Sequence, residues 1–322
     1  MTFAQDISRR RFIQKTGLAT GGLLAGFNMA WAQKAPRVLR VGHQKGWLSL
    51  LKTRGTLEKR LTPLGVSVTW TEFNAGPVQL EALNVGAIDF GDVGEAPPIF
   101  AQAAGAPLVY AGASVARPRL EAIVVPKGSP IKTVADLKGK RVAYNKGSNV
   151  HYFLVKLLQK NGLAYSDVQS IFLPPPDARA AFEKGSIDAW IIWDPFMAAA
   201  VKTLDAHVLV DATGVVNNRN YFFTSRDYAT QNPDVLRIAL EEIKAIDTWI
   251  SKNKPAAAVE LGQALGLDKQ IIETFLSRVD FGIVPINQAI LAEQQSIADA
   301  FFELKLIPKK INLLHAAPVS LG

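Results

Sequence analysis

The apolar positions along the chain switch repeatedly between two periods. Short runs of alternating or β-branched residues, such as residues 38–42 and 66–70, are typical of strands. Between these runs apolar residues recur every three or four positions, first from about Leu48 to Leu61 and again after Pro77, as in helices. Strands and helices that alternate at these lengths predict an α/β fold with parallel sheets.

The same order restarts after a strand-like run at residues 120–125. Residues 141–144 predict a strand and residues 150–158 predict a helix, with a polar turn between them. A further helix ends near Gly185, and residues 187–193 predict the next strand. The second half of the chain therefore repeats the order of the first half.

A short sequence repeat lies at corresponding places in the two halves. Gly86-Ala87-Ile88-Asp89 returns 99 residues later as Gly185-Ser186-Ile187-Asp188. Six residues after each Asp a second carboxylate follows, Glu95 in the first copy and Asp194 in the second. Chance repetition of common turn chemistry would also give such a pair. The shared frame of helix, strand and Pro-initiated helix favours two related lobes.

Two α/β lobes of this kind place the carboxyl ends of their strands at a common crevice, where ligands bind. No long linker separates the halves, so the chain must cross between lobes near residues 124–127 and return near residues 211–221. We therefore expect residues 33–125 to begin lobe 1, residues 126–215 to form lobe 2, and residues 216–322 to complete lobe 1 with helices. Such a hinged pair of lobes closes around its ligand.

The first 32 residues have the features of an export signal. A basic stretch at Arg9-Arg10-Arg11 precedes a short apolar run, and Ala30-Trp31-Ala32 matches a small-residue cleavage site. Paired arginines followed by Phe12 and Ile13 are typical of twin-arginine export, with the general secretory route as the alternative. We predict that residues 1–32 are removed.

The composition of the 322-residue chain excludes several kinds of site and partner. Its net charge is +8, but the predicted signal holds four basic residues and one acidic residue, which leaves +5 for the rest. The chain has no cysteine, which excludes disulfides, thiolate metal sites, cysteine nucleophiles and a lipidated cysteine. With only 4 histidines and scattered basic residues, we expect no metal, no cofactor and no nucleic-acid partner. We expect a protein that diffuses freely in the periplasm of a Gram-negative cell.

The second lobe offers a polar turn between a predicted strand and a predicted helix. The candidate ligand-binding residues there are Lys146, Gly147, Ser148, Asn149 and His151. The free backbone N–H groups and the dipole of a helix N-terminus favour an anion, and Gly147 permits close approach of the backbone. The alternative is a capped helix with ordinary surface polar groups, and His151 either faces the cleft or packs in the core.

The first lobe offers two loops that also follow the ends of predicted strands. Gln44 and Lys45 are donors at a strand end, although a solvated surface lysine is the alternative for Lys45. Gly94, Glu95 and Ala96 precede a predicted helix, so that the carboxylate of Glu95 caps the helix, lines the cleft, or does both.

The loop that matches Glu95 in the second lobe contains Trp193 and Asp194. Trp193 offers an apolar wall for an alkyl chain, whereas Trp190 should face the opposite side of the strand and lie in the core. A pair of carboxylates near a cleft also occurs in glycosidases. Nothing else in the sequence supports that chemistry.

The chain resembles the aliphatic-sulfonate-binding periplasmic proteins, the receptors of ATP-driven sulfonate importers, over essentially its whole predicted mature length. The segments that carry the resemblance are residues 42–45, 72–77, 80–86, 94–103, 145–151 and 189–195. The first segment usually reads Gly-Tyr-Gln-Lys in that family, and His43 stands here in place of the tyrosine.

The resemblance implies a two-lobe, type II periplasmic-binding fold with a hinge and a central ligand cleft. It implies a monomeric binding protein that captures an alkanesulfonate and delivers it to the membrane permease of an ABC importer as a sulfur source. Taurine, nitrate, a sulfate ester or an aromatic sulfonate are alternative solutes, and a sensor subunit is a further alternative. Enzymes similar to this scaffold rely on cysteine, so we expect no enzymatic activity.

Overall fold

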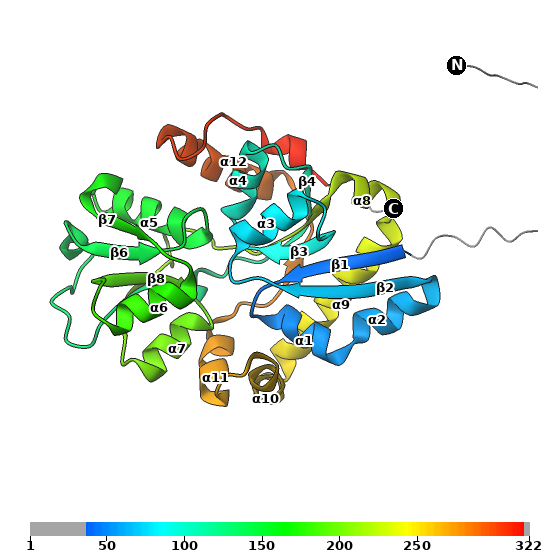
Figure 1. Cartoon of the computed structure of the whole chain (residues 1–322), viewed down its shortest axis with the longest axis horizontal. Helices are drawn as coiled ribbons and strands as arrows, with labels where there is room; N and C mark the ends of the chain where they lie inside the picture. The colour runs from blue at the N-terminus through cyan, green and yellow to red at the C-terminus, as the bar shows by residue number, and fades with distance from the viewer. Residues whose placement is uncertain (1–36, 319–322) are drawn as a thin grey trace, which may run out of the picture. The chain divides into compact units, whose positions relative to one another are not determined.

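The structure is a computed structural model that describes residues 37–318 (Figure 1). The predicted export signal lies outside the described residues, so its cleavage and its twin-arginine class stay predictions. Residues 37–318 form one compact unit. Among residues 37–318, no helix is both long and apolar enough to cross a membrane.

Two β-sheets organise this unit, as the alternating pattern predicts. The first sheet has the order β11-β4-β10-β3-β1-β2 and the second has the order β7-β6-β8-β5-β9. The strands of the first sheet are β1 (Arg37–His43), β2 (Val66–Glu72), β3 (Phe90–Val93), β4 (Leu108–Ser114), β10 (Tyr221–Ser225) and β11 (Ile283–Val284). Those of the second sheet are β5 (Glu121–Val125), β6 (Arg141–Tyr144), β7 (Gln169–Phe172), β8 (Ala189–Trp193) and β9 (His207–Asp211).

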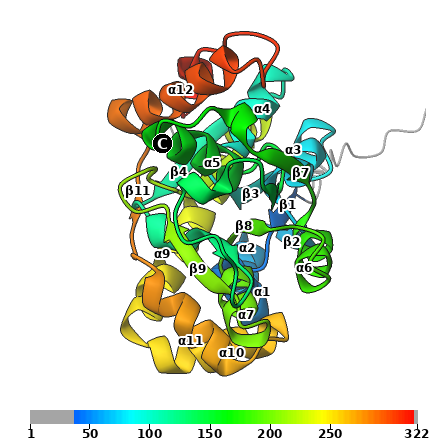
Figure 2. The same ribbon diagram turned by 90° about the vertical axis from the view of Figure 1, so that its left-hand side faces the viewer.

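The helices complete the α/β arrangement. They are α1 (Trp47–Arg54), α2 (Thr56–Leu61), α3 (Gly76–Asn84), α4 (Pro97–Ala103), α5 (Asn149–Lys160), α6 (Pro175–Glu183), α7 (Phe196–Thr203), α8 (Arg226–Gln231), α9 (Pro233–Lys252), α10 (Lys254–Leu265), α11 (Lys269–Arg278) and α12 (Gln288–Glu303). Short 3₁₀ turns lie at Thr62–Leu64, Pro118–Leu120, Ala135–Leu137, Tyr165–Asp167 and Leu313–Ala316. Figures 1 and 2 show α12 beside α4, on the opposite side of the first sheet from α10 and α11.

Two details differ from the sequence prediction. The sheets are mixed rather than wholly parallel, because β10 runs antiparallel to β3 and β4, and β5 runs antiparallel to β8 and β9. The single helix expected from Leu48 to Leu61 is two helices, which Gly55 separates with a positive φ of 61°. Glycine adopts this left-handed conformation without the steric cost that a Cβ imposes.

The repeated Gly-x-Ile-Asp segments make the same contacts in both sheets. Asp89 accepts hydrogen bonds from the backbone N–H and the guanidinium of Arg40, in the middle of the neighbouring strand β1. Asp188 accepts the same two kinds of bond from Arg141 in β6. In both copies the arginine also donates to the glycine carbonyl, of Gly86 or Gly185. In each sheet the repeat therefore links one strand, β1 or β6, to the turn that precedes the neighbouring strand, β3 or β8.

The chain passes from the first sheet to the second between Ser114 and Glu121, and it returns between Asp211 and Tyr221. The lobe boundaries expected after residues 125 and 215 stay a prediction. Trp190 is 1 % exposed and packs against Phe182, which confirms its expected place in the core.

Candidate functional site

A pocket of about 70 Å³ lies at the carboxyl ends of β1, β3 and β8, where the two sheets approach each other. A buried water needs about 10–15 Å³ on this measure, so the space holds several waters or a small solute. The residues that line it are Gln44, Lys45, Gly46, Trp47, Leu48, Asp92, Gly94, Leu120, Asn149, Trp193, Asp194, Asn218, Asn220 and Phe275.

Two helix N-termini meet at this pocket. Helix α1 begins at Trp47, and the backbone N–H groups of Trp47 and Leu48 have no acceptor among residues 37–318. Helix α5 begins at Asn149, whose backbone N–H also has no acceptor within that range. Lys45 lies next to the start of α1, and its ammonium group has no carboxylate partner in the described part of the chain. Free N–H groups, aligned helix dipoles and a lysine together favour an anion.

Asn149 ties the second sheet to the segments that connect the two sheets. Its side-chain amide donates to Glu121 Oε2 at 2.5 Å and to Asn218 Oδ1 at 3.1 Å. It also lies directly against Gly94, since a Cβ placed on that glycine would lie 2.9 Å from Cγ of Asn149. Gly94 therefore lets the loop after β3 pass beside the start of α5.

Six of the twelve residues singled out from the sequence line this pocket. They are Gln44, Lys45, Gly94, Asn149, Trp193 and Asp194. The other six, namely Glu95, Ala96, Lys146, Gly147, Ser148 and His151, lie outside its lining. Ligand contacts of all twelve stay a prediction. The six residues outside the lining make other contacts within the fold.

His151 packs in the core, one of the two places that the sequence leaves open. It is fully buried, and its Nε2 lies 3.0 Å from the hydroxyl of Tyr165. The backbone N–H of Gly147 donates to its Nδ1 at 3.2 Å, so that this N–H is already engaged. Burial among aromatic rings such as Phe100 lowers the pKa of His151 to about 4, with a smaller effect from Lys146. The imidazole is neutral at pH 7.

The rest of the polar turn stabilises its own structure. Ser148 donates from Oγ to the carbonyl of Asn145 at 2.7 Å. Lys146 is exposed, and its ammonium nitrogen lies 5.3 Å from the centre of the Phe172 ring. Of this turn, only the last residue, Asn149, lines the pocket.

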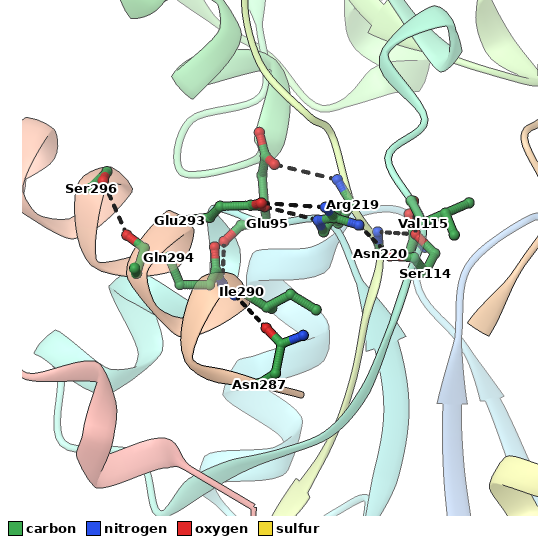
Figure 3. Close-up of polar contacts among 11 residues, drawn as sticks. Glu95, Ser114, Val115, Arg219, Asn220, Asn287, Ile290, Glu293, Gln294 and Ser296 are labelled. Carbon is green, nitrogen blue, oxygen red and sulfur yellow. Dashed lines mark hydrogen bonds and ion pairs between the residues drawn. The ribbon is translucent and has the colours of Figure 1, made fainter. Parts of the chain in front are cut away.

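Glu95 belongs to a separate polar cluster behind the pocket. Figure 3 shows its carboxylate beside the backbone of Arg219, whose N–H donates to Oε2 at 3.3 Å. The guanidinium of Arg219 is paired with Glu293 at 2.8 Å. Burial raises the pKa of Glu95 to about 8. The carboxylate makes no side-chain cap of helix α4, and the neighbouring Ala96 is fully buried in the core.

Asp194 lines the pocket but is already paired. Both of its oxygens accept from Arg278 at 3.0 and 2.9 Å, and Oδ1 also accepts from the N–H of Ala198 at 2.9 Å. Burial raises the pKa of Asp194, although Arg278 acts in the opposite direction. This ion pair joins the start of α7 to the end of α11. The neighbouring Trp193 is half-buried, with its ring edge-on to Phe196.

Asp92 is a lining residue that the sequence analysis did not single out. It lies in β3 and is 7 % exposed, and its Oδ2 accepts from the side-chain amide of Asn220 at 2.9 Å. Burial raises the pKa of Asp92 to about 6, although Asn220 and Arg117 lower it. Its place at the end of a strand was the signal that could have identified it.

Other lining residues come from segments without any local signature. Asn218 and Asn220 lie in the chain that returns to the first sheet, and Phe275 lies in α11. Behind the pocket, the fully buried guanidinium of Arg117 lies 4.2 Å from the centre of the Trp47 ring and donates to Asp247 at 2.9 Å. No sequence pattern indicates that these side chains meet.

The pocket is suited to binding a small anion with an apolar part. Its donors are the helix N-termini, Lys45 and side-chain amides, and its apolar walls come from Trp47, Trp193 and Phe275. No group of three or more His, Asp or Glu side chains within residues 37–318 is arranged to hold a metal ion.

The chain is similar in sequence and structure to known proteins. The NMT1/THI5-like family matches residues 64–252. The crystal structure of the periplasmic aliphatic sulphonate-binding protein SsuA from Escherichia coli is 41% identical, with a TM-score of 0.80, and the match covers 88% of this chain and 92% of that one.

Two further proteins are similar over most of the chain. The alkanesulfonate-binding protein SsuA from Xanthomonas axonopodis pv. citri, bound to MOPS, is 38% identical with a TM-score of 0.83, and the match covers 88% of this chain and 98% of that one. The taurine-binding periplasmic protein of Escherichia coli (strain K12) is 30% identical over 73% of this chain and 78% of its own length. These similarities confirm the expected periplasmic-binding fold.

Proposed function

The chain belongs to the NMT1/THI5-like family and to its aliphatic-sulfonate-binding proteins, and on this premise we propose that it captures an aliphatic sulfonate for an ABC importer. The ligand would be passed to the membrane permease of that importer as a source of sulfur. The relatives that support this proposal are named as binding proteins, and we propose that this chain, too, binds its ligand without converting it.

The observation that carries the proposal is the pairing of anion donors with aromatic walls in one pocket. A sulfonate is a permanent monoanion with three acceptor oxygens, which match the free N–H groups of α1 and α5 and the ammonium of Lys45. An alkyl tail gains free energy by leaving water for an apolar surface, and Trp193 and Phe275 provide that surface.

The proposal extends to the place of the protein in the cell. Relatives with periplasmic in their names support a periplasmic location. We propose that residues 1–32 direct export by the twin-arginine route and are then removed, and that the released chain acts as a monomer. We also propose that residues 33–125 with 216–322 and residues 126–215 move as two lobes that close on the ligand.

A binding panel tests the function. The purified chain from residue 33 would be heated with alkanesulfonates of two to six carbons, an aromatic sulfonate, taurine, a sulfate ester and nitrate. A ligand that binds the folded state raises the melting temperature. Titration calorimetry then ranks the affinities, and NMR of the recovered ligand shows whether it is unchanged.

We expect sulfonates to raise the melting temperature and to be recovered intact. A response to nitrate or a sulfate ester without any response to a sulfonate would overturn the proposed ligand class. Chemical conversion of the ligand would overturn the binding role.

A further inference from the structure

Asp92 is a pocket carboxylate without an ion-pair partner. Its Oδ2 accepts from Asn220, whereas its Oδ1 has no hydrogen-bond donor within residues 37–318. Asp194, the other carboxylate of the pocket, is held by the guanidinium of Arg278. The two side chains therefore differ in what they can offer a ligand, because only Asp92 has an oxygen free to accept.

This arrangement leaves the charge of Asp92 poorly compensated. The side chain is 7 % exposed, and burying a carboxylate without a cation is unfavourable. Burial raises the pKa of Asp92 to about 6, so the carboxyl group is still mostly ionised at pH 7. Arg117 acts against this shift but makes no ion pair with Asp92. A cation from the ligand would supply the missing countercharge.

The lining also contains an unpaired cation. Lys45 lies at the start of α1 and has no carboxylate partner in the described chain. The two uncompensated charges of the lining are thus one positive and one negative. The aromatic ring of Trp193 also lines this space, and such rings attract a cation through their faces. A ligand with a sulfonate at one end and an ammonium group at the other matches this pattern of charge.

We propose, resting on the sulfonate-binding function above, that Asp92 accepts a hydrogen bond from a cationic amino group on the ligand tail, so that the pocket prefers aminoalkanesulfonates to plain alkanesulfonates. The competing explanation is structural, with Asp92 serving only to hold Asn220 in place. Asp92→Asn separates the two roles, because the asparagine keeps an oxygen that can accept from Asn220 and loses the negative charge.

The test compares isosteric ligands. Propanesulfonate and 2-aminoethanesulfonate differ by a methyl group against an ammonium group, as do butanesulfonate and 3-aminopropanesulfonate. Titration calorimetry at pH 7.5 gives the affinity of all four for the wild type and for Asp92→Asn. Asp268→Asn is the control, because it removes one negative charge at an exposed helix cap where asparagine serves equally well.

We expect the wild type to bind the better amino ligand at least about tenfold more tightly than its isostere, the ratio that one charge-assisted hydrogen bond supplies. Asp92→Asn should remove that preference while changing the affinity for plain alkanesulfonates less than about threefold. Asp268→Asn should keep the preference.

Other results have distinct meanings. If plain alkanesulfonates bind the wild type as well as or better than the amino ligands, or if Asp92→Asn weakens both kinds equally, the role of Asp92 is overturned and the sulfonate function stands. If none of the four ligands binds the wild type, the proposed function itself fails.

Discussion

The close approach of Gly94 to Asn149 leads to a stability prediction for Gly94→Ala. The added Cβ would lie 2.9 Å from both Cγ and Oδ1 of Asn149, closer than nonbonded carbon atoms tolerate. Asn149 cannot swing away freely, because its amide is hydrogen-bonded to Glu121 and Asn218. The loop after β3 and the start of α5 must therefore move apart.

The magnitude follows from this overlap. Overpacking of a well-packed site by one methyl group costs about 1–3 kcal/mol. A change of 1 kcal/mol shifts the melting temperature of a chain of this size by roughly 2–4 °C. We expect Gly94→Ala to melt several degrees below the wild type in the absence of ligand, measured by calorimetry at pH 7.5.

Gly46→Ala is the matched control. Gly46 lines the same pocket, but a Cβ there meets no atom within 4 Å, and its φ of 177° suits any residue. We expect this variant to have the same melting temperature as the wild type.

A double-mutant cycle with Asn149→Ala identifies the cause of the loss. The truncation removes Cγ and Oδ1, the two atoms nearest to the new methyl group, and leaves Cβ of residue 149 at 3.0 Å, so Gly94→Ala should cost less in that background. Equal costs in both backgrounds, or a Gly94→Ala protein as stable as the wild type, would refute the reasoning.

Three further predictions concern charged and titratable groups. Lys45→Met should weaken binding of an alkanesulfonate at least about fivefold, and Lys52→Met should not, as titration calorimetry would show. Arg278→Met leaves Asp194 buried without its cation, so urea unfolding at pH 7.5 should show a loss of about 3 kcal/mol. That loss should shrink as the pH falls and Asp194 takes up a proton; a loss independent of pH would contradict this. Because burial lowers the pKa of His151 to about 4, the folded state excludes a proton that the unfolded chain binds below about pH 6.5. The wild type should therefore lose stability from pH 6.5 towards 4 more steeply than His151→Phe, by up to about 1.4 kcal/mol per pH unit, and parallel curves would contradict it.

The sequence alone determined the α/β class, and six of the twelve candidate site residues that it singled out line the pocket. Backbone preferences and apolar periodicity are local properties, so they placed strands and helices well and marked strand ends such as Lys45, Gly94 and Asp194 as places for a ligand. The mixed direction of the strands was not predicted, since it depends on which strands pair where β5 joins the second sheet and where the chain returns to the first sheet at β10.

Only the tertiary structure decided which polar side chains face the pocket. His151 turns inward because α5 packs against the aromatic ring of Phe301, far away in the sequence, whereas Asn149 at the start of the same helix faces Gly94. Asp92 accepts a hydrogen bond from Asn220, 128 residues further along the chain, which lowers its pKa, whereas burial raises that pKa to about 6. Burial and charge compensation depend on neighbours that folding supplies, and no local pattern of residues encodes them.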